Sequence, residues 1–373
     1  MQVAQQNTLV IAGALVDPGW VSPAQIAACI GQPAWARGLD TVAIARNAQS
    51  GDPNEEGFGA TAHDLWLRDH YFTDLEDPDV LSTVRRIAAL PVGDGDTHRP
   101  GDTSWLLEPA HFHLSRDHLA LLHGALASLS REDALALAEA IAPTLADAGF
   151  SCRVIAPDAW LLRDLPQSRS RESSGTSLGQ GRSPGPGTAT GAPEKAGGWQ
   201  LRAAGSERAW GRNVDAWLPE GTDARRWRRV LNEIQMTWFE HPVNEARAAR
   251  GELPVNAVWL GGPVPDGLVG RWRGAEDAQL SYDDSALQYR LSDDRDGWLA
   301  HLPRLGERIA AALALTPQLR IVLAGERETR TLARASGTPA RWWNAVRRRV
   351  RSAAPGALAG DTVAGWFRES EQS

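Results

Sequence analysis

The sequence predicts an α/β fold, or α+β in part, in which a mixed sheet is flanked by helices. Apolar runs too short for a helix, such as residues 8–15, alternate with longer segments whose apolar residues recur every three or four positions. This alternation is typical of strands connected by helices. The chain has 373 residues, which is enough for two domains, or one large one, each with a buried core.

The front part of the chain is expected to open with a buried strand at residues 8–15, closed by a turn at Asp17-Pro18-Gly19. Strand-like and helix-like segments then alternate through 62–72, 78–90 and 103–122. No basic leader precedes the first strand, and its apolar run is too short for export or for crossing a bilayer.

A helix is predicted over residues 129–150. Ser130 is the expected N-cap, because its hydroxyl can accept a hydrogen bond from the backbone N–H three residues later. Leu137, Ile141 and Leu145 form the expected buried face, and Gly149 ends the helix. A strand over 151–165 follows directly.

Residues 166–198 contain almost no large apolar side chains and are dominated by Gly, Ser, Pro, Thr and Arg. Such a segment cannot bury enough surface to offset the entropy of ordering it, so the composition predicts a long disordered insertion. We therefore expect an N-terminal α/β part at 1–165, a linker at 166–198 and a C-terminal α/β part at 199–373.

The back part contains two strongly periodic helices, at 223–240 and 296–315. The first has Trp227, Val230, Leu231, Ile234 and Trp238 at spacings of three and four. The second has Trp298, Leu302, Leu305, Ile309 and Leu313 at the same spacings. Pro317 separates the second helix from a short buried strand at 318–326.

Charge and cysteine content exclude several classes of protein. The net charge is −7, which argues against nucleic acid as a partner. Lys195 is the only lysine, so arginine carries nearly all positive charge. Cys29 and Cys152 lie far apart without zinc-site spacing, as a reducing cytoplasm tolerates.

The basic segment 341–351 predicts a helix with Trp342, Val346 and Val350 on one face, whose arginines are solvated or contact an anion or a protein partner.

Common catalytic motifs are missing from the sequence. It contains no GxxxxGK[ST], GxGxxG or HExxH pattern. His111 and His113 would share one face of a strand, a spacing that can chelate zinc, although no third ligand lies in an obvious place. His63 and His70 would lie two helical turns apart, close to Asp64 and Asp69. Core or surface roles are the simpler interpretation of both histidine pairs.

The segment 241–262, HPVNEARAARGELPVNAVWLGG, combines several features of an anion site. His241-Pro242 can start a helix that ends at Gly251. Asn244 and Arg247 would share a face of that helix, Arg250 would be an outer anchor, and Asn256 would begin the next strand. Guanidinium and amide groups near a helix N-terminus suit a phosphate or carboxylate. A capped helix–turn–strand without a ligand is the alternative interpretation.

This segment resembles the H-P-V-N-x-x-R-x-x-x-G-x-x-P-A-N-x-x-W-L-W-G segment of archaeal-type cofactor-independent phosphoglycerate mutases, which belong to the alkaline phosphatase superfamily. The resemblance extends more weakly to residues 231–240 and 129–163. It implies an alkaline phosphatase-like fold and a substrate pocket formed by His241, Asn244, Arg247, Arg250 and Asn256. The sequence also resembles a divergent bacterial group of phosphoglycerate mutase-like, or regulatory, proteins.

The resemblance also implies two divalent metals and a serine nucleophile. Here the first strand ends in Ala-Gly where an Asp-Gly pair is expected, with Asp17 as the nearest carboxylate, and the late strand has Gly325-Glu326 where Asp-His is expected. A two-metal site needs several carboxylates and imidazoles around the ions. The sequence therefore predicts no metal ligands, no cofactor and no identifiable catalytic residues.

Three functions remain open at this point. The first is a phosphoglycerate mutase-like protein without a metal centre that binds a small phosphorylated or carboxylated metabolite, or acts in regulation. The second is an active mutase or phosphatase that uses manganese or another divalent metal, with ligands drawn from Asp17, His63, Asp64, His70 and Glu326. The third is a structural or interaction protein that meets its partner through residues 341–351.

Overall fold

A computed structural model describes eleven parts of the chain, with the backbone alone at 42–49. They are residues 7–17, 19–30, 42–49, 61–91, 103–115, 118–122, 124, 126–165, 199–265, 267–334 and 367–368. The chain divides into two compact units, one formed by residues 1–88 with 269–373 and the other by residues 89–268. The predicted disordered insertion at 166–198 and the basic segment 341–351 lie outside the described residues.

The first unit contains a five-stranded mixed sheet in the order β2-β11-β10-β1-β9. β9, β1 and β10 are parallel, whereas β11 is antiparallel to both β10 and β2. The strands are β1 (Thr8–Ala12), β2 (Val42–Gln49), β9 (Leu280–Asp283), β10 (Arg320–Ala324) and β11 (Glu328–Arg334). All five residues of β1 are buried, as expected for a parallel strand covered on both faces.

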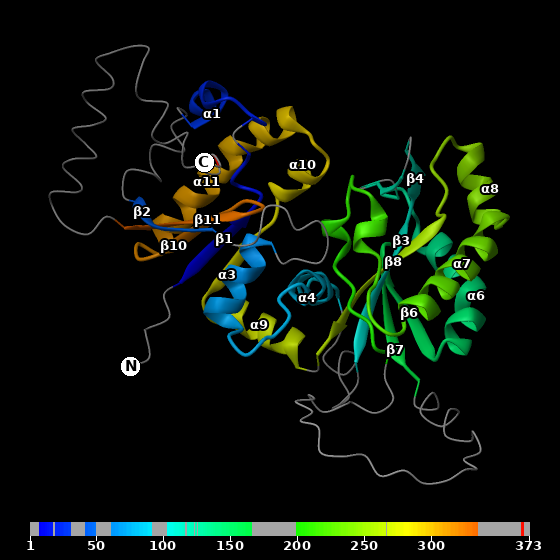
Figure 1. Ribbon diagram of the computed structural model, residues 1–373. Helices are drawn as coiled ribbons and strands as arrows, with labels where there is room; N and C mark the ends of the chain where they lie inside the picture. Colours follow the sequence, from blue (N-terminus) through cyan, green and yellow to red (C-terminus); the bar gives the residue numbers. More distant parts are fainter. Residues whose placement is uncertain are drawn as a thin grey trace, which may run out of the picture. The chain divides into compact units, whose positions relative to one another are not determined.

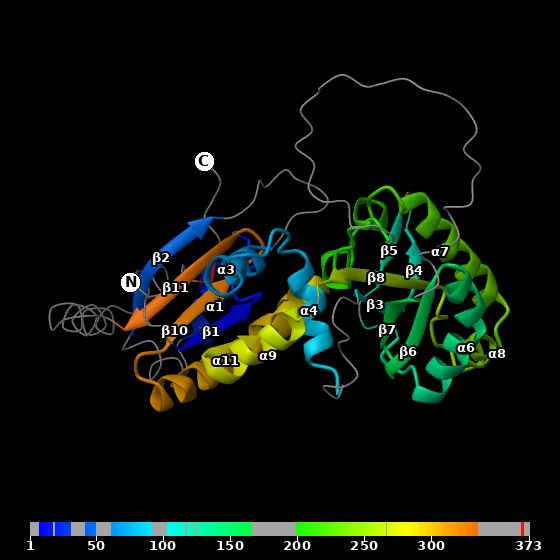
Figure 2. The ribbon, with the colours of Figure 1, turned by 90° about the horizontal axis from the view of Figure 1, so that it is seen from below.

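Helices cover both faces of this sheet, with α1 and α11 on one face and α3 and α9 on the other (Figures 1 and 2). The helices of the unit are α1 (Pro23–Ile30), α3 (Ala62–Tyr71), α4 (Val80–Ala88), α9 (Leu268–Ala278), α10 (Leu287–Leu291) and α11 (Arg295–Leu315). The predicted apolar stripe of α11 is confirmed, because Trp298, Leu302 and Ile309 pack in one core with Ile11 of β1 and Leu323 of β10. This arrangement places the loops after β1, β9 and β10 at one edge of the sheet.

The second unit is built on an antiparallel sheet in the order β6-β7-β3-β8, with β4 and β5 as a separate hairpin. Its strands are β3 (Ser104–Ala110), β4 (Phe112–Leu114), β5 (Leu119–Leu121), β6 (Phe150–Ala156), β7 (Ala159–Asp164) and β8 (Ala257–Val264). Its helices are α6 (Arg131–Asp147), α7 (Ala224–Phe239) and α8 (Pro242–Ala249), with 3-10 turns η2 (Ser206–Arg208) and η3 (Val214–Trp217). The expectation of an α/β fold with α+β organisation in part is confirmed, since the first unit has a mixed sheet and the second an antiparallel one.

The helices of the second unit bury the stripes that the sequence predicts. Leu137, Ile141 and Leu145 of α6 are fully buried, and Trp238 of α7 packs edge-on against Trp160 of β7 with ring centroids 6.0 Å apart. Ser130 caps α6, accepting a hydrogen bond from the Asp133 N–H at 3.0 Å. The single strand expected over 151–165 is in fact the hairpin β6–β7, which turns at Pro157-Asp158.

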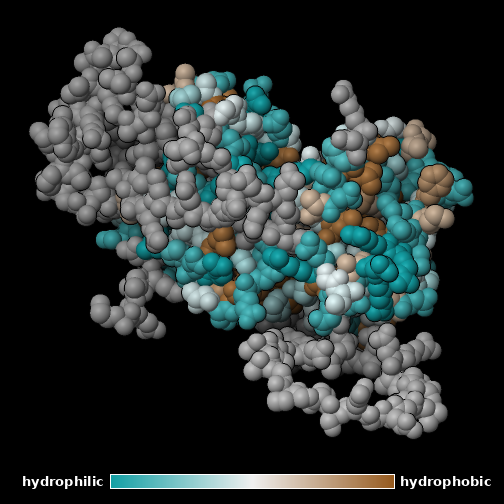
Figure 3. All heavy atoms as spheres, viewed as in Figure 1, coloured by the Kyte–Doolittle hydropathy of each residue, from teal (hydrophilic) through white to brown (hydrophobic). Residues whose placement is uncertain are grey.

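The units differ from the division at 166–198 that composition suggests. β3 and β7 precede that segment and β8 follows it, yet all three belong to one sheet. The face seen in Figure 3 is mostly hydrophilic, with hydrophobic residues in small groups among polar ones. No helix among the described residues is long and apolar enough to cross a membrane.

Candidate functional site

The 241–262 segment of the second unit forms the predicted helix and strand. His241 is the N-cap of α8, Pro242 lies in its first turn, and the His241 ring accepts a hydrogen bond from the Val243 N–H at 3.2 Å. The helix ends before Gly251, whose φ of 72° is in the left-handed region that favours glycine. β8 begins just after Asn256 and continues through the two glycines to Val264.

The two asparagines of the segment are engaged in hydrogen bonds with the protein's own backbone. Asn244 donates through Nδ2 to the carbonyls of Trp238 (2.8 Å) and Val255 (2.9 Å) and accepts from the Val255 N–H (2.8 Å). Asn256 accepts from the Phe112 N–H at 2.7 Å and donates to the Phe112 carbonyl at 3.0 Å. These bonds join the end of α7, the start of β8 and β4, so both side chains stabilise the local fold.

Arg247 is the most buried member of the predicted site, with 0% of its side chain exposed. Its Nε donates to the Leu253 carbonyl at 2.8 Å. Nη1 lies 3.3 Å from a carboxylate oxygen of Glu252, within ion-pair range but without hydrogen-bond geometry, and neither Nη1 nor Nη2 has a hydrogen-bond acceptor among the described residues. A buried guanidinium with unused donors is uncommon, because such groups normally bind oxygen atoms.

Glu252 is the anion nearest to both arginines of the segment. Its carboxylate accepts a hydrogen bond from the exposed Arg250 at 2.9 Å as well as facing Arg247. The hydrogen bond from Arg250 is the largest influence that lowers the pKa of Glu252. The structure thus brings Arg247 and Arg250 together around the carboxylate of Glu252. The side chains of Asn244, Asn256 and His241 form hydrogen bonds with backbone groups instead.

In the first unit, Asp17 and Glu326 meet at the edge of the sheet where β1 and β10 end. The guanidinium of Arg290, from α10, lies between them, with Nη2 2.8 Å from an Asp17 oxygen and 4.0 Å from a Glu326 oxygen. Its charge also faces the ring of Trp20, 4.5 Å from the centroid. The loops after parallel strands are where α/β proteins commonly bind ligands.

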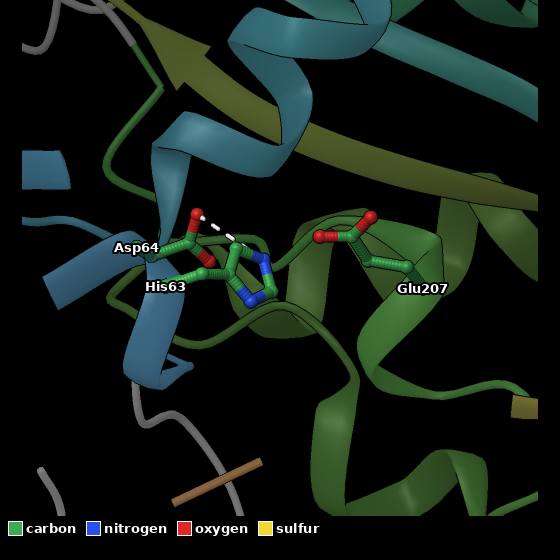
Figure 4. A group of neighbouring side chains, drawn as sticks. All are labelled: His63, Asp64 and Glu207. Carbon is green, nitrogen blue, oxygen red and sulfur yellow. Dashed lines mark ion pairs between the residues drawn. The ribbon is translucent and has the colours of Figure 1, made fainter. Parts of the chain in front are cut away.

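His63 and Asp64 lie in the first turn of α3, with His63 Nε2 3.7 Å from an Asp64 oxygen (Figure 4). Asp64 is fully buried and accepts hydrogen bonds from Arg85 of α4 and from the hydroxyl of Thr61. Arg85 also lies 3.2 Å from His63 Nε2. Burial is the largest single influence and acts to raise the pKa of Asp64, but the charges of Arg85 and His63 and the hydrogen bonds from Arg85 and Thr61 together outweigh it and hold that pKa below the usual value.

The remaining histidines named from the sequence lie in separate places. His70 is on the exposed side of α3, where it stacks on Trp66 with ring centroids 4.0 Å apart and donates to the Trp66 carbonyl. His111 is buried and donates to the Pro254 carbonyl at 2.8 Å, while the exposed His113 has its ring centroid 6.3 Å away. Within the described ranges, no third metal-ligating side chain joins His111 and His113.

The two-metal site that the family resemblance implies does not fit these residues. Asp17 and Glu326 hold the guanidinium of Arg290, and Asp64 with His63 holds that of Arg85. Each set therefore already contains a fixed positive charge, which would repel a divalent cation at short range. The sequence did not indicate either arginine, because each partner pair joins distant segments, 273 residues apart for Arg290 and Asp17.

Comparison with known proteins gives a fold-level likeness only. No family model and no curated protein sequence matches the chain. Its structure is similar to that of the cofactor-independent phosphoglycerate mutase from Thermoplasma acidophilum DSM 1728, with 13% identity, a TM-score of 0.33, and 89% of this chain and 91% of that chain covered. It is also similar to the PH0037 protein from Pyrococcus horikoshii, with 11% identity, a TM-score of 0.37, and 90% and 89% covered.

Proposed function

We propose that this protein is a phosphoglycerate mutase-like protein that binds a small phosphorylated or carboxylated metabolite through the 241–262 segment and acts in regulation. In this proposal it works in the cytoplasm, without nucleic acid or membrane as a partner. The resemblance of the segment gives the ligand class. The observation that carries the proposal is the buried guanidinium of Arg247, whose two Nη atoms have no hydrogen-bond acceptor among the described residues.

Most of the hydrogen-bond donors of Arg247 are unused among the described residues. A guanidinium has five N–H groups, of which only the Nε–H of Arg247 donates, to Leu253. Burying the others without acceptors costs free energy, and the oxygens of a phosphate or carboxylate can accept from two of them at once. Glu252, next to Arg247 and partly exposed, occupies the position of such an anion. A ligand that displaces the Glu252 carboxylate would satisfy the same guanidinium.

The arginines at the candidate metal ligands support the binding role over the metal-dependent one. Catalysis by two metals would require Asp17, Glu326, His63 and Asp64 to exchange Arg290 and Arg85 for ions. In the proposed function these carboxylates are structural partners of the arginines, and ligand binding takes place without a metal.

Titration calorimetry of the full chain with 3-phosphoglycerate, in buffer without divalent ions, tests the proposal. We expect binding in the wild type, at least a tenfold loss of affinity in Arg247→Met, and a smaller loss in Arg250→Met, because Arg250 is exposed and its charge is screened by solvent. Glu252→Gln should bind more tightly, since it removes the competing carboxylate. Inorganic phosphate serves as the second ligand in each titration.

Two results would contradict this function. One is the absence of a binding heat for both ligands with the folded wild type. The other is an affinity in Arg247→Met equal to that of the wild type, with circular dichroism showing that the variant is folded. Methionine is the chosen replacement because it keeps an unbranched apolar stem in the buried position without the charge.

A further inference from the structure

A serine and a histidine of the first unit form a hydrogen bond at the edge of the sheet where β9 ends. Ser285 follows β9 by two residues, and its Oγ lies 2.8 Å from Nε2 of His301 in the first third of α11. Both residues are partly buried. Because β9 is parallel to β1, Ser285 lies at the sheet edge where α/β proteins commonly place reacting groups.

α11 holds His301 in a fixed position relative to the sheet. Trp298 and Leu302, on either side of His301 in the sequence, are fully buried in the core, and the Trp298 ring donates to the Gly13 carbonyl at 2.8 Å. Ser285 is fixed in turn, since its N–H donates to a carboxylate oxygen of Asp283 at 2.9 Å. The Oγ–Nε2 contact therefore joins two well-anchored elements.

Burial, more than the neighbouring charges, favours the neutral form of His301. Burial is the largest influence that lowers the pKa of His301, Asp283 acts to raise it, and Arg304 acts to lower it, with a net shift downward. The ring is therefore neutral at neutral pH. Its Nδ1 is buried and has no hydrogen-bond partner among the described residues, so Ser285 is the one hydrogen-bonding partner that the described structure gives the ring.

Two arginines lie near the Ser285–His301 pair, on the exposed face of α11. Arg304 and Arg308 follow His301 by three and seven residues, which places them on the same side of the helix. Arg308 pairs with the buried Asp283 at 3.0 Å, whereas Arg304 is exposed. A carboxylate or phosphate group on a molecule bound near Ser285 could pair with Arg304.

We propose that Ser285 and His301 are a nucleophile–base pair that cleaves small esters bearing a carboxylate or phosphate group, with Arg304 binding that group. A nucleophile within hydrogen-bond reach of a neutral imidazole is the arrangement that activates serine in acyl transfer. This site lies in a different unit from the 241–262 segment and does not depend on the proposed metabolite binding.

The reaction balances without a metal or a redox partner. Ser285 Oγ attacks the ester carbonyl carbon while His301 Nε2 takes the hydroxyl proton. The bond from that carbon to the leaving oxygen breaks, and His301 returns the proton to the departing alcohol. Water then attacks the acyl-serine, giving one proton to His301 and from there to Ser285 Oγ, and the carboxylic acid leaves.

Covalent labelling of the full chain tests the pair. We would incubate the protein with a fluorophosphonate and locate the adduct by mass spectrometry, and then compare hydrolysis of 4-nitrophenyl hemisuccinate with that of 4-nitrophenyl acetate. We expect labelling at Ser285, none at that position in Ser285→Ala, and at least a hundredfold slower labelling in His301→Gln. Ser281→Ala, which removes an exposed serine of β9 four residues before Ser285, should label at the wild-type rate.

The substrate class is tested by Arg304→Gln, which should lose the preference for hemisuccinate over acetate and keep the labelling of Ser285. The proposal is overturned if folded wild-type protein is not labelled at Ser285, or if His301→Gln labels at the wild-type rate. The His301→Gln variant keeps Ser285, so its labelling rate tests the proposal even if Ser285→Ala does not fold. A hydrogen bond with only a structural role would predict no adduct in any variant.

Discussion

Asp64 and Asp74 each bind an arginine of the first unit, but water reaches only one of the two pairs. Asp64 is 1% exposed and Arg85 is 8% exposed, whereas Asp74 is 70% exposed in its bidentate pair with Arg271. Removing one partner of a buried pair leaves an uncompensated charge inside the protein. An exposed charge that loses its partner is hydrated by solvent.

We therefore expect Asp64→Asn to lower the free energy of unfolding by about 3–5 kcal/mol. Asp74→Asn should change it far less. Urea unfolding followed by circular dichroism measures both values at pH 7. Equal effects for the two substitutions would show that the Asp64–Arg85 pair does not stabilise the fold as a buried pair.

The same pair gives a pH dependence of known sign. The pKa of Asp64 in the folded state lies below the usual 3.8, so the unfolded chain binds more protons than the folded one between the folded pKa and 3.8. The stabilisation is fully present above pH 3.8 and is lost as pH falls through the folded pKa. The difference between wild type and Asp64→Asn should shrink over that acidic window and stay constant near neutrality.

At this scale the sequence predicts what is local. Ser130 was identifiable as a cap because its partner, Asp133, is three residues away. The sequence predicts that Arg247 belongs to an anion site, but it does not predict that its side chain is buried or that it contacts Glu252. Ser285 and His301 gave no signal, since neither fits a known motif and only the packing of α11 brings them together.

At the scale of the element, α7 has one buried face and one exposed face. Trp238 is fully buried and its ring donates to the Leu137 carbonyl at 3.0 Å, whereas Met236, two residues earlier, is 79% exposed. The spacing of three and four predicted this division, because residues on one face of a helix share one environment.

Trp238→Ala should destabilise the second unit by about 3–5 kcal/mol, from the cavity and the lost hydrogen bond. Met236→Ala, as the matched control, should change stability by less than about 0.5 kcal/mol. Thermal unfolding monitored by near-ultraviolet circular dichroism compares the two. A control substitution as harmful as the tryptophan one would contradict the burial of α7 described above.

Element boundaries depend on turns that periodicity does not reveal. Residues 151–165 are expected from the sequence to form one strand, and the hairpin β6–β7 divides them at Pro157-Asp158. β7 is more buried than β6, and proline followed by aspartate suits a tight turn. The sequence predicted strand here correctly, while the reversal of direction required the pairing of β6 with β7 to be known.

At the scale of the whole molecule, the grouping of strands differs from the order of the chain. A fragment of residues 89–268 contains every strand of the four-stranded sheet β6-β7-β3-β8, whereas a fragment of residues 1–165 lacks β8 and also lacks β9 and β10, the two neighbours of β1. Composition alone favoured a division at 166–198, because a Gly- and Ser-rich segment is typical of a linker.

We expect the 89–268 fragment to unfold cooperatively in urea and the 1–165 fragment to show no cooperative transition. The reason is that only the first of these fragments keeps a complete sheet with its buried helices. Cooperative unfolding of the 1–165 fragment, with no transition in 89–268, would contradict the division into these two units.

Strand pairing in the first unit also determines how long β1 stays without its neighbouring strands while the chain is being synthesised. Thr8 of β1 pairs with Arg320 of β10, 312 residues further along. At roughly 5–20 residues per second, the ribosome needs about 15–60 s to produce that partner after β1 is made. The apolar β1 strand has neither neighbour until β9 is made, and only one until β10 follows, so nascent chains of this protein should bind chaperones through β1 until β9 and β10 emerge.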